Sequence, residues 1–366
     1  MKQPKITIVT AAYNLIEVGR EKSFRECVEI IHNQTYKNIE HIIINNNSTD
    51  GTQKLIDEYV EKGWVTCHFQ PIQGLWHAMQ KGIDVATGDF INFMNSDDKF
   101  SGLDSIELIV NEIVKQRADY AFSDALGLCE DNPEQCWTGT SQYYWVGDLK
   151  NVPFGQCMCH QSLFVSMDTM REFGGFDFNY KLSLDNHMML KLQLKGKKPA
   201  YVPKPLVTFF FGGWSSQLSG SEIQEDYKLN FYDQIGKSMG LTLEECGELR
   251  CFEAVYQKDE KYCRKLAKKI TNKEWRKTFL DKLKEQNKKD SKGFCHFFGA
   301  PVITFFQNEH KVSIKCLQLP IFDIERKNDC RTARIFGEVL KIIKTEKKLS
   351  WYILGVKVFS KNRKQF

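Results

Sequence analysis

The sequence lacks a long hydrophobic run, and its 366 residues contain no stretch of about 18 consecutive apolar residues. A helix that crosses a bilayer needs about 20 predominantly apolar residues. The first residues also lack the basic start, apolar centre and small-residue cleavage site of a secretion signal. We therefore expect no transmembrane helix and no export, and predict a cytoplasmic protein.

A disulfide framework is also missing, although the chain has 12 cysteines. Their spacing is irregular, and proteins that are not exported keep their thiols reduced, so we predict free thiols. Cys157, Cys159 and His160 lie close together in the sequence. A structural zinc site needs two properly spaced ligand pairs, and no second pair is present. We therefore favour buried thiols over zinc at this position.

The whole chain has no strong excess of one charge, since its formal net charge is +5. The net charge of residues 1–250 nevertheless differs in sign from that of residues 251–366. From residue 251 onward there are 28 Lys and Arg against 13 Asp and Glu, whereas residues 1–250 have 23 against 33. Such asymmetry favours a basic part that meets an anionic surface, either membrane or nucleic acid. No nucleic-acid recognition motif accompanies the basic residues, so no nucleic acid is expected. A solvated basic helix is the other interpretation.

Short β-rich runs alternate with helical stretches in the first hundred residues. We predict strands at Ile6–Thr10, Ile39–Ile44, Val65–Phe69 and Phe90–Met94, and helices at Ser23–Asn33, Leu55–Val60 and Trp76–Ala86. This order predicts a parallel sheet with helices on both faces. Ligands of such sheets bind beyond the carboxyl ends of the strands. That rule selects the loops 11–14, 45–52 and 95–99.

The later part of the chain has a different character. Between Lys258 and Lys292 there are 14 Lys and Arg in charged, helical sequence. Beyond it, residues 298–303 resemble residues 336–341, which indicates a small β module made by duplication. We predict three segments: an α/β domain over 1–220, a basic helical segment over 221–295 and a duplicated β-hairpin module over 296–366.

Two adjacent carboxylates, Asp97 and Asp98, follow the fourth predicted strand after Asn95 and Ser96. Adjacent carboxylates repel each other and lose hydration, so they need a cation or hydrogen-bond donors nearby. Such oxygen ligands suit Mg²⁺ or Mn²⁺, which bind through one or two carboxylates plus substrate phosphates. Capping of the next helix by Ser96 or Asp97 is the structural alternative.

A series of ordered motifs then points to a known family. They are VTAAYN, INNNSTDGT, GLWHAMQKGIDVATGDFINFMNSDD, CHQSLF, GGFD, LSLDNHMMLKL and FGGWSS. Together they resemble family 2 of the glycosyltransferases, especially the bacterial branch that builds surface polysaccharides and lipopolysaccharide. The resemblance covers roughly residues 4–218. It implies the GT-A nucleotide-diphosphate-sugar fold, an α/β fold with a mostly parallel sheet flanked by helices.

The resemblance assigns residues to the donor side of the site. Ala11 and Tyr13 would hold the nucleotide base. Asn45 stands where the family usually has an Asp that reads the uracil edge, and its amide can still accept and donate one hydrogen bond. Asp50 also matches a family Asp, but its position before Gly51 and Thr52 favours a helix N-cap.

The resemblance also places the metal and the donor sugar. Asp97 would be the main metal ligand, with Asn95 beside it in the acidic motif and Asp98 close to the donor sugar. The remaining residues of the donor-sugar side would be Gly74, His77 and Lys81. His77 is one position where this chain departs from the family branch, so the identity of the sugar stays open.

Asp185 matches the family's catalytic base. Inverting transfer needs a carboxylate that removes the proton of the acceptor hydroxyl, and the metal would stabilise the leaving diphosphate. An N-cap of the helix that follows is the other role that we considered for Asp185. On the acceptor and diphosphate side the resemblance implies His160, Gln161, Gly213 and Trp214.

We therefore predict an inverting, Mn²⁺- or Mg²⁺-dependent transfer of a hexose or N-acetylhexosamine from a nucleotide-sugar donor, with UDP as the nucleotide. The acceptor would be a glycan or a lipid-linked glycan, and residues 258–366 would meet an anionic membrane peripherally, on its inner face. A sugar-nucleotide nucleotidyltransferase is the first alternative, although residues 11–14 lack its Gly-rich basic loop. A non-catalytic glycan-binding or scaffold protein is the second. The oligomeric state stays open.

Overall fold

The computed structural model describes residues 3–71, 73–128, 142–145, 147–154, 158–210 and 220–297, and beyond them further strands as far as residue 362. The chain forms two compact units, Met1–Glu253 and Ala254–Phe366. The division falls inside the segment 221–295, which the sequence predicts as one helical region.

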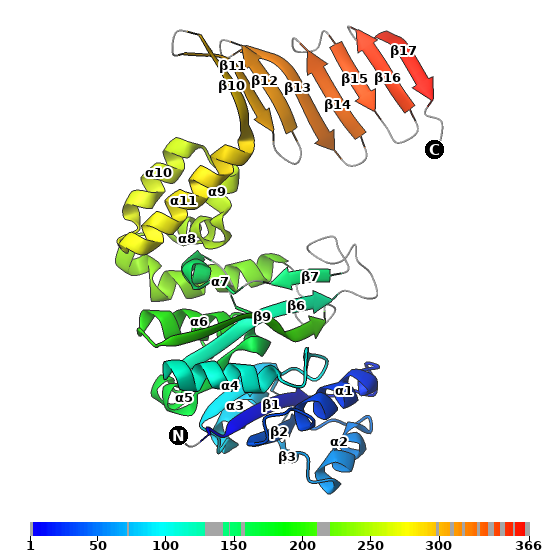
Figure 1. Cartoon of the computed structure of the whole chain (residues 1–366), viewed down its shortest axis with the longest axis vertical. Coiled ribbons are helices and arrows are strands. Elements are labelled where there is room, and N and C mark those ends of the chain that lie inside the picture. Colours follow the sequence, from blue (N-terminus) through cyan, green and yellow to red (C-terminus); the bar gives the residue numbers. More distant parts are fainter. Residues whose placement is uncertain are drawn as a thin grey trace. The chain divides into compact units, whose positions relative to one another are not determined.

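Within the described residues, the first unit is built on a nine-stranded sheet (Figure 1). Its order is β3-β2-β1-β4-β8-β6-β9-β5, and β7 pairs with β6. The strands are β1 (Ile6–Ala12), β2 (Ile39–Asn45), β3 (Thr66–Phe69), β4 (Phe90–Phe93), β5 (Lys99–Phe100), β6 (Tyr120–Leu128), β7 (Gln142–Trp145), β8 (Phe164–Ser166) and β9 (Pro199–Phe210). The pairs among β1, β2, β3 and β4 are parallel, whereas β8 is antiparallel to both β4 and β6.

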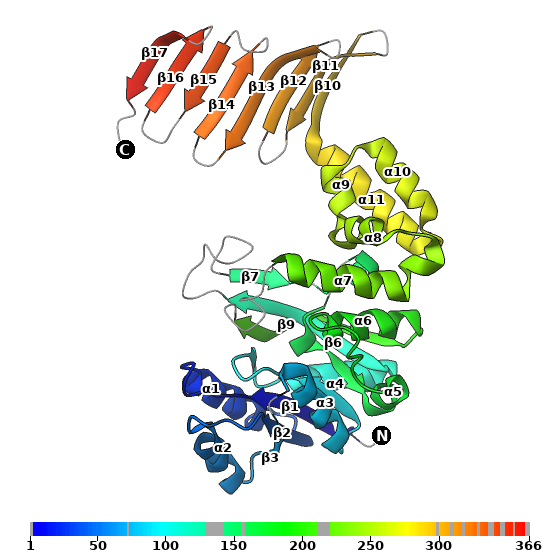
Figure 2. The same ribbon diagram turned by 180° about the vertical axis from the view of Figure 1, so that it is seen from behind.

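Helices cover both faces of this sheet. The helices of the first unit are α1 (Glu21–His32), α2 (Thr52–Glu61), α3 (Leu75–Val85), α4 (Ser105–Gln116), α5 (Met167–Phe173), α6 (Leu184–Leu194), α7 (Gly220–Gln234) and α8 (Leu243–Leu249), of which α7 packs on α6 and α8 on α7. Figures 1 and 2 show α4 and α3 on opposite faces. A Cβ atom on Gly82 would lie 2.4 Å from Cγ1 of Val9, so this glycine lets α3 pack closely against β1.

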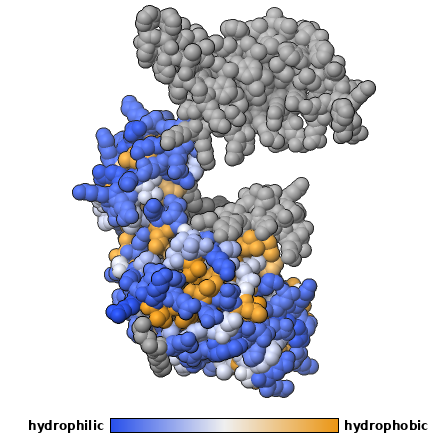
Figure 3. Space-filling view, viewed as in Figure 1, coloured by the Kyte–Doolittle hydropathy of each residue, from blue (hydrophilic) through white to orange (hydrophobic). Residues whose placement is uncertain are grey.

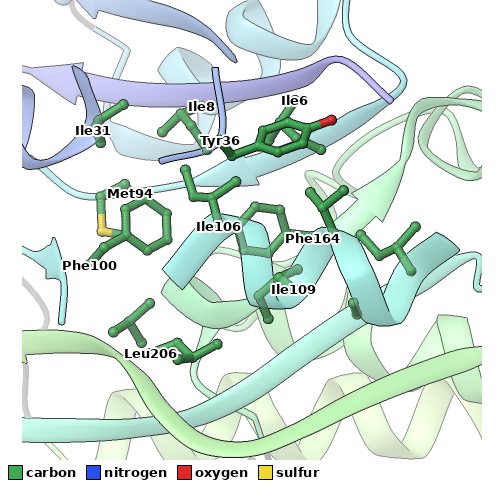
Figure 4. Close-up of a cluster of buried hydrophobic side chains, with 14 of the residues drawn as sticks. Ile6, Ile8, Ile31, Tyr36, Met94, Phe100, Ile106, Ile109, Phe164 and Leu206 are labelled. Atoms are coloured by element: carbon green, nitrogen blue, oxygen red, sulfur yellow. The ribbon is translucent and has the colours of Figure 1, made fainter. Parts of the chain in front are cut away.

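A large buried cluster of the first unit lies between β1 and α4 (Figure 4). Ile6 and Ile8 point to the same face because side chains alternate along a strand. They pack with Ile106 and Ile109 of α4 and with Phe164 of β8. Full burial of each such side chain contributes about 1.5–3 kcal/mol to the free energy of unfolding, so the cluster holds α4 against the face formed by β1 and β8.

The elements predicted for the first hundred residues are present, with ends that agree to within three residues. Alternation of β-rich and helical patterns identified them, most clearly at β1 and β2, which are buried on both faces over most of their length. The α/β fold class is confirmed. The parallel arrangement holds for β1 to β4 and for β6 with β9, and the antiparallel strand β8 joins these two parts.

The second unit begins with helices and continues as a sheet. The helices are α10 (Glu260–Lys269) and α11 (Lys273–Asp290), preceded by the short α9 (Glu253–Gln257) at the division. The strands are β10 (Ser291–Phe297), β11 (Ala300–Gln307), β12 (Lys311–Cys316), β13 (Leu319–Lys327), β14 (Cys330–Ile335), β15 (Leu340–Lys344), β16 (Lys348–Ile353) and β17 (Val356–Asn362). They form an antiparallel meander in which each strand pairs with the next.

The surface of α10 and α11 is mostly hydrophilic (Figure 3). On α10 the buried side chains are Cys263, Leu266 and Ala267, and the exposed ones include Lys261, Arg264, Lys265 and Lys268. No helix among the described residues combines the length and the apolar character needed to cross a bilayer.

Candidate active site

The three predicted ligand loops meet at one edge of the sheet. β1 lies between β2 and β4, so the residues that follow these parallel strands are neighbours. The loops after β1 and β2 are joined by hydrogen bonds: the Asn14 amide N donates to Ser48 Oγ at 3.0 Å, and the Thr49 amide N donates to Asn14 Oδ1 at 3.0 Å. Their shape is therefore fixed jointly.

Asn45 is fully buried at the end of β2. Its Nδ2 donates to Gln53 Oε1 at 2.6 Å, and its Oδ1 accepts from the amide N and Oγ of Ser48 at 3.0 and 2.7 Å. Both amide atoms are therefore engaged within the loop and do not face a base in this structure. Asp50 accepts hydrogen bonds from Thr52 just ahead of α2, whose N-cap is Gly51.

Ala11 and Tyr13 lie at the carboxyl end of β1, where the sequence places the nucleotide base. Ala11 is half-buried, and the Tyr13 side chain is 46% exposed. An exposed aromatic ring of this kind offers a flat apolar face on which a base can stack. Tyr13 is therefore available for the predicted role.

Helix α3 carries the residues predicted for the donor-sugar side. Gly74 is its N-cap and has φ of +90°, a conformation that favours glycine. His77 is exposed, and its ring stacks on Phe178 with the centroids 4.3 Å apart. Lys81 is half-buried one turn further along the helix. Phe178 is itself 44% exposed, so the pair presents aromatic surface to solvent.

Asp97 forms an ion pair with Arg20, between Oδ2 of the carboxylate and Nη1 of the guanidinium. The two side chains are 14% and 26% exposed, so the pair is half-buried. Arg20 is the N-cap residue of α1 and ends the loop after β1. The ion pair therefore joins the loop after β1 to the loop after β4.

Asp98 points inward and is buried. It accepts hydrogen bonds from Gln161 Nε2 at 2.6 Å, from the Phe210 amide N at 2.9 Å and from Asn95 Nδ2 at 2.9 Å. Burial raises the pKa of this carboxyl, against the effect of these donors. Asp98 thus fixes the loop to Gln161 and β9, and it does not face the solvent side of the loop.

His160 lies between the metal-side loop and Asp185. Asn95 Nδ2 is 3.4 Å from His160 Nε2, and His160 Nδ1 is 3.7 Å from Asp185 Oδ2. Gln161, the next residue, is buried and holds Asp98. The structure therefore brings five predicted site residues together, namely Asn95, Asp98, His160, Gln161 and Asp185. The imidazole of His160 connects the loop after β4 to Asp185.

Asp185 lies in the first turn of α6, whose N-cap is Ser183. The N-cap interpretation of Asp185 is therefore wrong. The backbone N–H groups just before α6 instead donate to Asp226 of α7. Its carboxylate accepts from the amide N atoms of Lys181, Leu182 and Ser183 at 3.1, 2.9 and 2.7 Å. Burial raises the pKa of Asp185, and the nearby His160 opposes that rise.

A small cavity adjoins Asp185 and His160. Its other walls are apolar and include Trp76, Phe93 and Phe176, whose rings contact one another at centroid distances of 5.3 to 5.4 Å. A carboxylate beside apolar walls is a stronger base than one in water. This surrounding therefore suits Asp185 to the removal of a proton.

Among the described residues, no three His, Cys, Asp or Glu side chains converge as metal ligands. Asp98 is used internally, so Asp97 is the carboxylate of this loop that is open to a cation. Mg²⁺ and Mn²⁺ need only one or two carboxylates when substrate phosphates and water complete the shell. The donor set therefore fits a cation that arrives with a diphosphate.

Two predicted residues, Gly213 and Trp214, lie outside the described residues, as does Cys157. Five of the cysteines within the described ranges form no disulfide, namely Cys27, Cys67, Cys159, Cys246 and Cys263. Sequence reasoning missed three charged residues at the site: Arg20, Asp226 and Arg250. Arg20 follows Gly19 directly before a helix, which is a detectable signal. Arg250 and Asp226 lie in helices far along the chain, and only tertiary structure brings them to α6.

The sheet order and the three loops define a GT-A fold of the glycosyltransferase type. Residues 7–153 match the model of the family described as Glycosyl transferase family 2, and this part of the chain belongs to that family. The predicted resemblance is confirmed.

Relatives and solved structures agree with this assignment. The chain is 31% identical over 217 residues to Glycosyltransferase GlyA of Streptococcus pneumoniae, which covers 56% of this chain and 30% of that protein. It is 23% identical over 190 residues to a PGL/p-HBAD biosynthesis glycosyltransferase of Mycobacterium tuberculosis, covering 50% of this chain and 68% of that protein. The crystal structure of S. aureus TarS 1–349 in complex with UDP-GlcNAc shares the fold, with a TM-score of 0.51, 13% identity, and coverage of 83% of this chain and 97% of that chain.

Proposed function

We propose that this chain is an inverting, metal-dependent glycosyltransferase that moves a hexose or N-acetylhexosamine from UDP to a glycan or lipid-linked glycan. The contact of His160 with both Asn95 and Asp185 is the observation that carries the proposal. It brings a loop suited to a diphosphate and a buried carboxylate suited to a base into one site. Single displacement at an anomeric carbon needs these two groups on opposite sides of the sugar.

Each residue then has a defined task. Tyr13 would stack on the base, and Asp97 would hold the cation that accompanies the diphosphate. A bound Mn²⁺ or Mg²⁺ would supply positive charge to the leaving diphosphate. Asp185 removes the proton of the acceptor hydroxyl, and its apolar surroundings favour uptake of that proton. His160 orients the Asp185 carboxylate toward the acceptor.

The choice of UDP rests on two supports. The motif resemblance implies uracil recognition at the end of β2, and a structural neighbour, S. aureus TarS 1–349, was crystallised in complex with UDP-GlcNAc. Asn45 is occupied within its own loop, so base recognition would come from Tyr13 and from backbone groups of the loop. A lipid-linked acceptor accords with the basic surface of α10, which would hold the protein at the inner face of a membrane.

A donor screen tests the proposal. The purified protein with Mn²⁺ is incubated with a panel of nucleotide sugars, and the free nucleoside diphosphate from slow donor hydrolysis is measured. We expect one UDP-sugar to turn over well above the others, with the activity lost in EDTA. Release of pyrophosphate from UTP and a sugar phosphate would instead identify a nucleotidyltransferase. Binding of glycan without turnover of any donor would identify a non-catalytic protein.

A further inference from the structure

We propose that Arg20 neutralises Asp97 in the donor-free protein and moves to the diphosphate when cation and donor bind. Arg20 would thus be a diphosphate-binding residue that also couples metal binding to nucleotide binding. The inference rests on the proposed function, because it takes the ligand of this site to be a nucleoside diphosphate with a divalent cation.

The ion pair between Arg20 and Asp97 distinguishes these two residues from the other charged residues nearby. Asp98 is buried and saturated by donors, which leaves Asp97 as the carboxylate facing the three loops. The nearby cations have other partners: Lys99 Nζ pairs with Glu26 at 2.7 Å, and the guanidinium of Arg25 pairs with two glutamates. Arg20 is therefore the cation that the fold directs to the predicted metal ligand.

The backbone at Arg20 is fixed by hydrogen bonds, and its side chain is partly exposed. The Arg20 amide N donates to the Leu15 carbonyl at 2.7 Å, and the Phe24 amide N donates to the Arg20 carbonyl at 3.0 Å. The guanidinium is at the end of a long side chain that is 26% exposed, so we expect its exchange between Asp97 and a phosphate to need no movement of the backbone of α1.

The electrostatics favour such a transfer. A divalent cation must displace the guanidinium from Asp97, so Arg20 weakens metal binding to the empty site. A diphosphate then offers the guanidinium planar, bidentate hydrogen bonds of the kind that arginine forms with phosphate. Cation and nucleotide consequently strengthen each other's binding, and the coupling is reciprocal.

Binding measurements with Mn²⁺ and UDP test the inference. Mn²⁺ binding is followed by electron paramagnetic resonance without nucleotide, and UDP binding by calorimetry in EDTA. We expect Arg20→Ala to bind Mn²⁺ about tenfold more tightly and UDP about tenfold more weakly than wild type, within the range of measured couplings. Arg20→Lys should lie between the two. Arg25→Ala removes a cation of the same helix that does not touch Asp97, and it should change neither affinity by more than about twofold.

The outcomes separate this inference from the proposed function. Unchanged Mn²⁺ and UDP affinities in Arg20→Ala, with normal donor turnover by wild type, would overturn the role of Arg20 and leave the function standing. If Arg20→Ala loses UDP binding but keeps the Mn²⁺ affinity of wild type, Arg20 binds phosphate without competing with the metal for Asp97. That result would overturn the proposed movement of Arg20 from Asp97 to the diphosphate. Absence of both Mn²⁺ and UDP binding in wild type and in Arg20→Ala would contradict the function itself and the inference with it.

Discussion

Arg250 Nη1 donates a 2.9 Å hydrogen bond to Oδ1 of Asn186, the residue that follows Asp185. The guanidinium is buried and lies over the Tyr227 ring, 4.1 Å from its centroid. A buried cation next to the proposed base lowers the pKa of that carboxyl, in opposition to the effect of burial. Arg250 therefore holds the residue next to Asp185 and counteracts the rise in the pKa of the Asp185 carboxyl.

We predict that Arg250→Met moves the acid limb of the pH profile of kcat/KM to higher pH. Loss of the positive charge raises the pKa of Asp185 further, so the base is protonated over more of the range. The expected shift is about one pH unit, equal to about 1.4 kcal/mol. Arg250→Lys keeps the positive charge, so its acid limb should lie close to the pH of the wild-type limb. If the acid limb of a folded Arg250→Met protein stays at the wild-type pH, Arg250 has a structural role and does not affect the pKa of Asp185.

We predict that Asp226→Asn lowers the free energy of unfolding by about 1–3 kcal/mol at pH 7, because a charged acceptor of three amide N–H groups is lost. Burial would raise the pKa of Asp226, but the hydrogen bonds outweigh it and the pKa is lowered. Its stabilisation is therefore complete above the unfolded-state pKa of about 3.9 and is lost as the pH falls through the lower folded-state pKa.

Urea unfolding of wild type and Asp226→Asn at several pH values checks this. The difference between the two proteins should be large at pH 7 and should shrink toward pH 3. Asp168, whose side chain is fully exposed, provides a matched control, since Asp168→Asn should leave stability unchanged to within about 0.5 kcal/mol. A difference that does not depend on pH would show that the charge of Asp226 does not cap α6.

We predict reversible binding of the whole protein to anionic vesicles through the basic face of α10. Each Lys or Arg near such a surface contributes about 1 kcal/mol, and salt screens the attraction. Replacement of Lys261, Lys265 and Lys268 by Glu should therefore abolish co-sedimentation with phosphatidylserine vesicles at low salt. All three side chains are exposed, so the variant should fold normally.

The control for this experiment is the same number of charge reversals in the first unit, at the exposed residues Lys22, Lys54 and Lys115. These changes lower the net charge equally but leave α10 intact. Equal loss of vesicle binding in both variants would attribute the effect to total charge. Absence of binding by wild type at low salt would refute membrane association through α10.

The first four strands and the loops after them can be predicted from the sequence, because short runs of neighbouring residues determine where each strand begins and ends. A buried parallel strand requires a continuous apolar run, and the polar residues that follow it mark its carboxyl end. Asn95 and Asp97 are predicted in this way, whereas His160 and Asp185 are assigned by the motifs of the family. The structure links Asn95, His160 and Asp185 by direct contacts.

The orientation of individual side chains could not be predicted in this way. Asp97 and Asp98 are adjacent in the sequence, yet one faces the loops and the other is buried, and only the positions of Gln161 and β9 decide which. Arg250 reaches the site through tertiary packing, and no spacing in the sequence indicates its position next to Asp185.

The central claim is that Asp97 serves the nucleotide and Asp185 serves the acceptor. Its most direct test is titration of UDP with Mn²⁺ into wild type, Asp97→Asn and Asp185→Asn, with donor turnover measured on the same preparations. The account predicts at least about tenfold weaker UDP binding for Asp97→Asn. For Asp185→Asn it predicts affinity within about twofold of wild type and turnover reduced by about 10²–10⁴-fold. Equal loss of UDP affinity in both variants, or normal turnover by Asp185→Asn, would contradict it.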